Sequence, residues 1–179
     1  GAVRESAIAE ALLFGEPYRP WIEALRKAMP TESALVLDIA MVAGAAFPIY
    51  DTVAPSAWIH PTGLGTLGYA LPAAIGTKIA APDRQVAALA GDGGFMFTMS
   101  ELSVAVQHSL TIPIILWNNR GYGEIKRLME ERGDQPHASD LRTPDIATLA
   151  TAFGAQSEVV REPVALIDAV GRAFEADGP

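Results

Sequence analysis

The sequence predicts an α/β fold, with a parallel sheet flanked by helices on both faces. Three short apolar runs, at 34–39, 85–90 and 112–117, have the length and composition of buried strands. Segments whose apolar residues recur at helical spacing lie between these runs. Because parallel strands are joined by crossover connections that pack against the sheet, this alternation predicts one sheet between two helical layers.

The first half of the chain contains two predicted helices around the first strand. Apolar residues at helical spacing between Pro20 and Pro30 indicate the first helix. The strand at 34–39 follows, and after it comes a proline-containing loop. Helical spacing resumes over 67–80, where we expect a second helix that Pro82 ends.

The second half repeats the order of strand and helix. Thr98, with Glu101 three residues later, forms a capping-box signature for a helix that reaches about His108. Four further elements are predicted after the strand at 112–117. They are a helix over 123–131, a helix capped by Thr143 with Pro144 at its first position and Gly154 at its end, a strand over 157–160, and a helix over 163–176.

The length of 179 residues fits one domain. We assign residues 1–30 to a linker and first helix, and residues 31–179 to the domain itself. The sequence stops at Asp177-Gly178-Pro179, a turn signal with no strand after it. Since the alternating pattern predicts one more strand, we expect a fragment of a longer protein, truncated before its last strand.

Charge and composition exclude several classes of function. The formal net charge of −8 argues against nucleic acid or an anionic membrane surface as a partner, because both need clustered Lys and Arg. The absence of cysteine excludes disulfides, thiolate zinc sites and cysteine nucleophiles. Nothing resembles a signal peptide or the roughly 18 apolar residues of a membrane helix, so a cytoplasmic location is expected.

The main functional motif is Gly91-Asp92-Gly93 followed, after 24 residues, by Asn118-Asn119. Each group directly follows a predicted buried strand. In a parallel sheet both would therefore lie at the carboxyl edge, where ligands bind. A carboxylate and an amide oxygen suit Mg²⁺, which prefers oxygen ligands and phosphate.

These residues resemble the cofactor motif of the thiamine-diphosphate (ThDP)-dependent decarboxylase and acetolactate synthase superfamily. The resemblance covers nearly the whole chain and implies its ThDP-binding fold, with residues 31–179 as the diphosphate-binding domain. It implies that Asp92, the side-chain oxygen of Asn119 and the carbonyl of Gly121 ligate Mg²⁺. The metal would offset the charge of the two phosphates. Further residues expected around the diphosphate are Gly91, Gly93, Gly94 and Tyr122.

A second segment, Gly63 to Gly76, is similar to the GxLGxALPAAIG stretch of benzoylformate-decarboxylase-like and acetolactate-synthase-like members. The resemblance implies that Leu67 supports the bent form of the cofactor. It also implies that the carbonyl of Gly65 accepts a hydrogen bond from the aminopyrimidine.

Two positions depart from the patterns of relatives. Pyruvate decarboxylases have a working glutamate six positions after the second Asn, where this chain has Ile125, and Glu124 is one residue away. Since one residue turns a helix by about 100°, we expect Glu124 to be a structural or solvated charge. After the first strand, Ala40-Met41 replace hydroxyl or Gln side chains. The segment 121–126 is similar to the guanidino-oxopentanoate decarboxylase branch.

The resemblance implies a three-domain, Mg²⁺-dependent 2-oxo acid decarboxylase or carboligase that forms a homodimer or homotetramer. The activating glutamate would come from a pyrimidine-binding domain of another subunit. We therefore expect no catalytic residue in this chain and no activity from it alone. The identity of the 2-oxo acid, the choice between decarboxylase and synthase, and FAD in the central domain stay open.

Two other functions compete with this interpretation. The run Gly63 to Gly68 also matches G-x-G-x-x-G, with Asp83 20 residues after its start, as in an NAD- or FAD-binding module. However, Asp83 precedes the strand that it should end. The second alternative is a regulatory domain that no longer binds the cofactor, although the motif residues Asp92, Asn119 and Gly121 are intact. No role is predicted for His60, His108 or His137, of which His137 is the best candidate for contact with substrate.

Overall fold

The computed structural model describes residues 9 and 12–179, and within this part it contains one parallel sheet of four strands. The strands lie in the order β2-β1-β3-β4, and all pair in parallel. Their bounds are Ala34–Leu37 for β1, Trp58–Ile59 for β2, Val86–Gly91 for β3 and Ile114–Trp117 for β4. The α/β fold class is confirmed.

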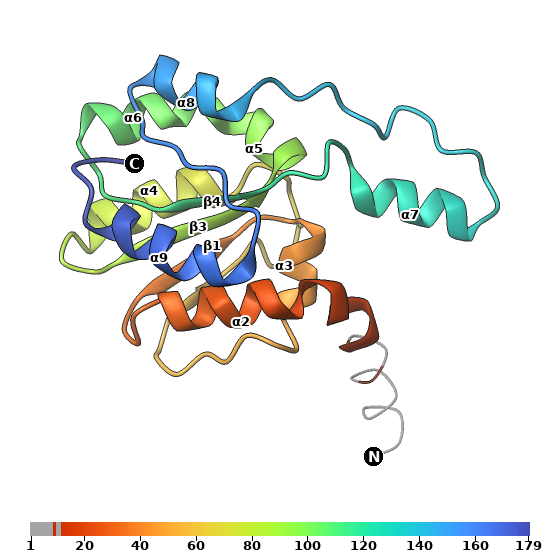
Figure 1. Cartoon of the computed structure of the whole chain (residues 1–179), viewed down its shortest axis with the longest axis horizontal. Helices are drawn as coiled ribbons and strands as arrows, with labels where there is room; N and C mark the ends of the chain where they lie inside the picture. Colours follow the sequence, from red (N-terminus) through yellow and green to blue (C-terminus); the bar gives the residue numbers. More distant parts are fainter. Residues whose placement is uncertain (1–8, 10–11) are drawn as a thin grey trace.

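Helices cover both faces of the sheet (Figure 1). On one face lie α2 (Arg19–Ala28), preceded by the short η1 (Glu16–Tyr18), α3 (Met41–Ala46) and α9 (Pro163–Phe174). The other face carries α4 (Ala70–Ala80), α5 (Asp92–Thr98), η2 (Met99–Glu101), α6 (Leu102–Gln107) and α8 (Ile146–Phe153). Helix α7 (Gly123–Glu131) extends away from both layers.

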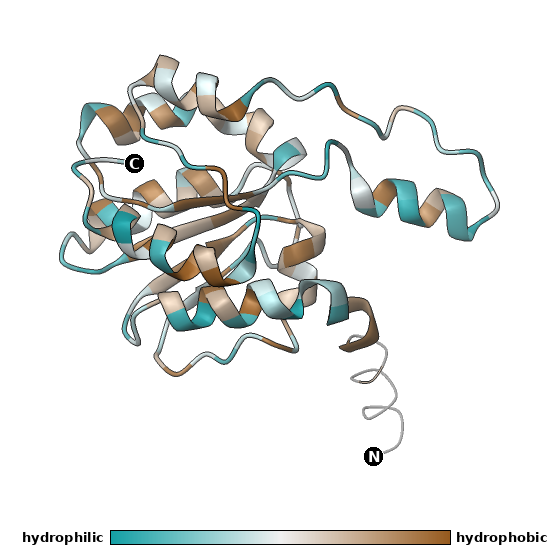
Figure 2. Ribbon diagram, in the orientation of Figure 1, coloured by the Kyte–Doolittle hydropathy of each residue, from teal (hydrophilic) through white to brown (hydrophobic). Residues whose placement is uncertain are grey.

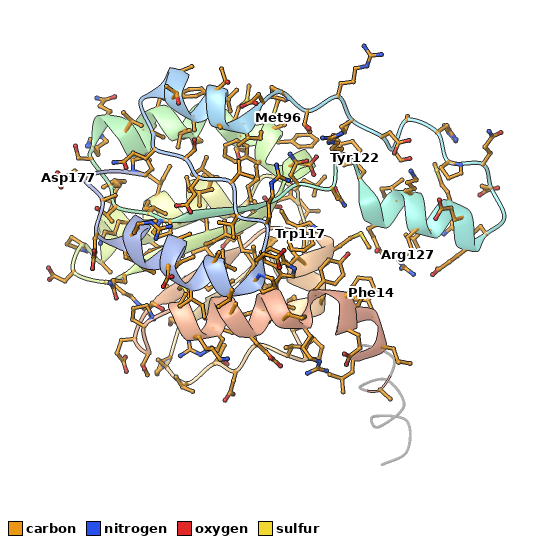
Figure 3. All side chains as sticks on the ribbon, in the orientation of Figure 1. Phe14, Met96, Trp117, Tyr122, Arg127 and Asp177 are labelled. Atoms are coloured by element: carbon orange, nitrogen blue, oxygen red, sulfur yellow. The ribbon has the colours of Figure 1, made fainter. Side chains whose placement is uncertain are left out.

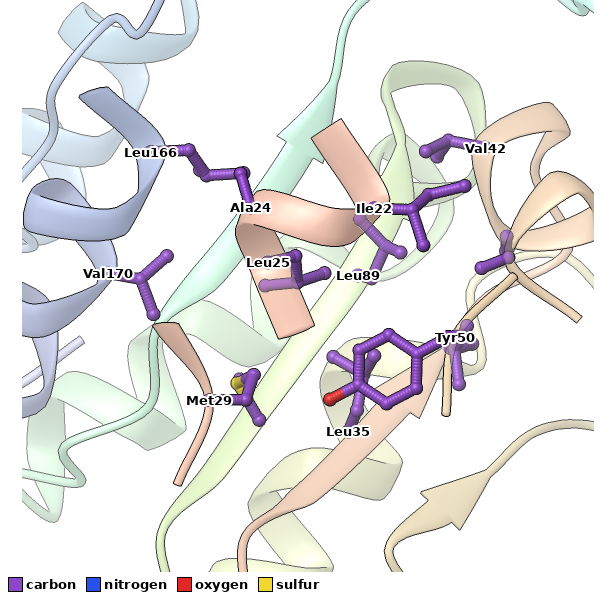
Figure 4. Packing of buried hydrophobic residues seen from close by; sticks show 14 of the residues in the cluster. Ile22, Ala24, Leu25, Met29, Leu35, Val42, Tyr50, Leu89, Leu166 and Val170 are labelled. Carbon is purple, nitrogen blue, oxygen red and sulfur yellow. The ribbon is translucent and has the colours of Figure 1, made fainter. Parts of the chain in front are cut away.

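Alternation of strand side chains divides the core into two halves. Leu35 and Leu89 contact the layer of α2, α3 and α9, whereas Val36 and Ala88 face α4, α5 and α6. Figure 4 shows the first half, where Ala24 of α2 and Leu166 of α9 lie side by side over the sheet. Successive residues of a strand point to opposite faces, so a sheet covered on both sides needs continuous apolar runs.

Figure 2 shows the apolar sides of α2 and α9 turned toward the sheet, whereas α7 is mostly hydrophilic. No residue of α7 is buried. Its position depends on contacts at its first turns. The guanidinium of Arg127 lies 5.8 Å from the ring centre of Phe14 (Figure 3), and the thioether of Met41 lies against Gly123.

Several predicted boundaries were wrong. The segment after β1 was predicted to be a proline-containing loop, but it contains α3 and β2. Helix α4 begins at Ala70 rather than at Leu67, because Gly65 and Gly68 have φ values of 65° and 81°, outside the helical region.

The helix predicted from Thr98 to about His108 is present as η2 and α6, with Thr98 at the N-cap position, and the sequence reasoning missed the separate helix α5 that precedes it from Asp92. The hydroxyl of Thr98 does not cap a helix but donates to the carbonyl oxygen of Gly68 at 3.0 Å. The cap of α8 is Asp145 rather than Thr143, since its carboxylate accepts from the N–H of Thr148 at 2.8 Å. Gly154 ends α8 with φ 87°, as predicted.

The strand predicted over 157–160 is absent from the described part of the chain, where these residues are irregular. A cavity of about 790 Å³ is lined both by β4 and by this segment. The segment forms no ladder with β4, and of its four residues only Val159 and Val160 are apolar. Across the described residues, no helix is long and apolar enough to span a membrane.

Candidate functional site

The two halves of the main motif lie at the same edge of the sheet. Gly91 ends β3, and its register partner Trp117 ends the neighbouring β4. Asp92 and Asn119 therefore follow adjacent strand ends, as the strand order requires. The structure thus brings these two positions to one carboxyl edge, whereas their metal-binding roles remain predictions.

Asp92 is a buried carboxylate without a hydrogen-bond partner. The residue is 1% exposed, and within the described part of the chain neither of its oxygens accepts a hydrogen bond. Burial raises the pKa of Asp92, while the nearby backbone N–H groups of Gly93, Gly121 and Asn119 partly oppose that shift without reaching hydrogen-bond geometry. A buried unpaired carboxylate is costly, and such groups in native proteins are commonly paired or bind a metal.

This environment fits a hard divalent cation. Asp92 supplies free carboxylate oxygens, and the backbone of Gly121 and Asn119 lies close enough to influence its pKa. Oxygen ligands of this kind are those that Mg²⁺ prefers. No cluster of three or more His, Cys, Asp or Glu occurs in the described residues, so an ion here would use amide, carbonyl or phosphate oxygens beside Asp92.

Hydrogen bonds donated by backbone N–H groups hold the turn after β4. The N–H of Arg120 donates to the side-chain oxygen of Asn118 at 3.1 Å, and the N–H of Tyr122 donates to the carbonyl of Ser139 at 2.8 Å. A Cβ at Gly121 would lie 2.5 Å from that same carbonyl. Only glycine therefore allows this close approach of the two chain segments.

The ring of Tyr122 lies against the start of α5. A Cβ at Gly93 would be 2.7 Å from Cε1 of Tyr122, so these two residues are in direct contact. In Figure 3 Tyr122 lies at the end of the turn that leads into α7. The structure therefore joins Gly93 and Tyr122, both of which were predicted to lie around the diphosphate.

The second motif forms a turn between β2 and α4. Gly65 is exposed, with its N–H donating to the carbonyl of Pro61 at 3.2 Å, and Leu67 is half-buried. A Cβ at Gly68 would lie 3.0 Å from side-chain atoms of Phe97 and Thr98. The turn thus packs against the end of the same helix that begins with Asp92.

Sequence reasoning missed Asp38, which follows β1 at the same edge. Its carboxylate is 2% exposed and accepts N–H groups from Ile39 at 2.7 Å and from Gly68 at 3.0 and 3.1 Å. Burial raises the pKa of Asp38, and the backbone donors of Ile39, Ala70, Gly68 and Tyr69 oppose that rise. A carboxylate directly after a buried strand was the signal that could have identified it.

The residues that depart from relatives have packing or charge roles. The thioether of Met41 accepts from the hydroxyl of Tyr18 at 3.8 Å, and it fills the space that a side chain at Gly123 would need. Glu124 pairs with Arg127 at 2.6 Å, and this partner lowers the pKa of Glu124. Glu124 is therefore a structural charge, as expected, and Ile125 is 49% exposed.

The histidines do not gather at this edge. His60 contacts the ring of Phe47 edge to face at 4.7 Å, and His108 ends α6. His137 lies exposed in the loop after α7, where its Nδ1 is 3.3 Å from the carbonyl of Gln135. The structure gives none of the three a contact with Asp92 or Asp38.

The run Gly63 to Gly68 does not have the geometry of a dinucleotide-binding motif. The strand before Gly63 is the two-residue edge strand β2, and α4 begins only at Ala70. Asp83 lies before β3 rather than at its end. A dinucleotide site needs a glycine turn that leads directly from a buried strand into a helix, so an NAD- or FAD-binding module is not supported.

Comparison with known proteins agrees with this geometry. Residues 38–179 match the family described as "Thiamine pyrophosphate enzyme, C-terminal TPP binding domain". The chain is 37% identical over 143 residues to a probable 2-ketoarginine decarboxylase of Pseudomonas aeruginosa, covering 79% of this chain and 25% of that protein. It is 32% identical over 158 residues to the acetolactate synthase isozyme 3 large subunit of Escherichia coli, covering 86% and 27%.

Among solved structures, the chain is similar to the thiamine diphosphate-dependent 4-hydroxybenzoylformate decarboxylase of Rhodococcus jostii RHA1. That match has a TM-score of 0.81 at 26% identity and covers 93% of this chain and 31% of the other. The chain thus spans about a quarter of the length of the two relatives named above. Thiamine pyrophosphate is the same compound as ThDP, and Mg²⁺ is its usual partner metal in this family. The chain therefore belongs to the thiamine pyrophosphate enzyme family and carries its C-terminal TPP-binding domain.

Proposed function

We propose that this chain binds the diphosphate of ThDP through Mg²⁺ held by Asp92, Asn119 and the carbonyl of Gly121. The observation that carries the proposal is the carboxylate of Asp92, which is buried and unpartnered at the carboxyl edge of the sheet. A divalent cation would supply the missing partner and offset the charge of an anionic cofactor on a protein of net charge −8.

The remaining residues bind and orient the cofactor. Gly91, Gly93 and Gly94 present backbone beside Asp92, and Tyr122 packs over Gly93. Gly65 and Leu67, on the turn that contacts α5, are proposed to hold the aminopyrimidine end. When bound, ThDP supplies the nucleophilic carbon and the electron sink for cleavage next to a 2-oxo group.

We further propose that the whole protein is a 2-oxo acid decarboxylase or carboligase with a homodimeric or homotetrameric assembly. The pyrimidine-binding domain of another subunit would complete the site, and the isolated chain would be inactive. Exposed apolar side chains support such a partner, because Leu64, Phe97 and Ile125 belong to the turn, to α5 and to α7, which carry or adjoin the proposed binding residues.

Calorimetric titration of the chain with ThDP tests the binding proposal. We expect affinity in Mg²⁺ that EDTA abolishes, and a loss of at least tenfold, about 1.4 kcal/mol, in Asp92→Ala. Asp145→Ala, which removes a carboxylate cap far along the chain, is the matched control. Equal ThDP affinity with and without EDTA would refute the role of the metal.

A further inference from the structure

A network of hydrogen bonds connects the two halves of the proposed cofactor site through Gly68. The N–H of Gly68 donates to both oxygens of Asp38, at 3.1 and 3.0 Å. On the other side of the same residue, the carbonyl of Gly68 accepts from the hydroxyl of Thr98 at 3.0 Å. Both polar backbone groups of one turn residue are therefore held by side chains from distant segments.

These two side chains belong to the elements that frame the site. Asp38 follows β1, and Thr98 is the last residue of α5, the helix that begins with Asp92. Asp38 also touches α5 directly, since a Cβ at Gly94 would lie 3.1 Å from its carboxyl carbon. The carboxylate thus lies between the Gly63–Gly68 turn and the first turn of α5.

The backbone N–H groups around Asp38 require a side chain that only accepts hydrogen bonds. Asp38 accepts from Ile39 at 2.7 Å and lies 3.5 Å from the N–H of Ala70, in addition to its bonds with Gly68. An ionised carboxylate can satisfy several donors at once, whereas an amide of the same shape would direct its own N–H group at one of them. The charge, and not only the volume, therefore matters at this position.

We infer that Asp38 is a positioning residue, which with Thr98 fixes the turn of Gly65 and Leu67 against the helix that begins with Asp92. This inference rests on the proposed function, because it assigns the two connected segments to the two ends of ThDP. The spacing between those segments sets the length of cofactor that the site accepts. Asp38 is not among the residues proposed to contact either end of the cofactor.

Two ligands separate a positioning role from a general role in folding. Mg²⁺ with inorganic pyrophosphate engages only the diphosphate end, whereas Mg²⁺ with ThDP requires both ends. We expect Asp38→Asn to weaken ThDP binding at least tenfold and to leave pyrophosphate affinity within about twofold of the unchanged chain. Thr98→Val should give a smaller loss on ThDP alone, since it removes one neutral donor.

Matched controls remove similar bonds away from the site. Asp145→Asn alters a carboxylate that accepts a backbone N–H at the cap of α8, and Thr77→Val removes a hydroxyl that donates to the carbonyl of Ala73 within α4. Both controls should keep the affinity for both ligands. If Asp38→Asn does not unfold cooperatively, the same pair of titrations on Thr98→Val decides the question.

Equal losses on both ligands, or unchanged ThDP affinity in a folded variant, would overturn the inference. Failure of the proposed function has a different result. In that case the unchanged chain would bind neither ligand in a Mg²⁺-dependent manner, before any substitution at Asp38 is made.

Discussion

Asp92→Asn should stabilise the metal-free chain while it removes Mg²⁺-dependent binding of ThDP. The substitution keeps the shape of the side chain and removes a buried charge whose oxygens have no hydrogen-bond partner in the described structure. An unsatisfied buried polar group is more costly when it is charged, and the amide of Asn stays buried and polar, so the substitution removes only the excess cost of the charge. We therefore expect the free energy of unfolding to rise by about 1 kcal/mol.

The pKa direction predicts how this gain depends on pH. Burial raises the pKa of Asp92 in the folded chain above its unfolded value, so the folded state binds the proton more tightly. The metal-free chain should consequently lose stability as pH rises from the unfolded pKa, near 4, through the raised folded value. Asp92→Asn should be most stabilising above that range and nearly neutral below it.

Thermal unfolding followed by circular dichroism, in EDTA and in Mg²⁺ with ThDP, measures both effects. For a chain of this size each kcal/mol corresponds to roughly 2–4 °C in Tm. Mg²⁺ with ThDP should raise the Tm of the unchanged chain and leave that of Asp92→Asn unaltered. The reasoning fails if Asp92→Asn lowers the Tm in EDTA at neutral pH, or if it retains the Tm increase from the cofactor.

Two glycine substitutions test a close contact at Gly93 and a positive φ angle at Gly154. Gly93→Ala places a Cβ 2.7 Å from the ring of Tyr122, so the ring must move, and ThDP affinity should fall several-fold with little change in the affinity for Mg²⁺ alone by calorimetry. Unchanged ThDP affinity would show that the ring position is irrelevant to binding. Gly154→Ala forces φ 87° on a residue with a Cβ and should lower the free energy of unfolding by about 1 kcal/mol in denaturant titration, with ThDP affinity unchanged. A stabilised variant would contradict the strain argument.

The fold class was predictable because its evidence is local. Each apolar run at 34–39, 85–90 and 112–117 lies where the structure has a strand, and the intervening helices follow in order. Errors arose where tertiary contacts override local patterns. Thr98 has a capping signature, yet its hydroxyl bonds to Gly68, 30 residues away. The apolar residues at 157–160 have no strand partner in the described structure.

The candidate site was predictable only in part. The placement of Asp92 and Asn119 at one edge was predictable because both follow strands that must end there. Asp38 was missed because its importance depends on donors from Gly68 and Ala70, which the turn after β2 brings to it. No periodicity in the sequence predicts that these N–H groups lie beside the carboxylate of Asp38.

The sequence by itself determined the alternation of strand and helix, the order of the chemical groups along the chain, and the resemblance to ThDP enzymes. Only the tertiary structure decided that Asp92 is buried without a partner, that Tyr122 packs on Gly93, and that Asp38 joins the turn to α5. Local propensity and hydrophobic period act over a few residues. Desolvation and hydrogen bonding between strand ends depend on distances that exist only after the sheet has formed.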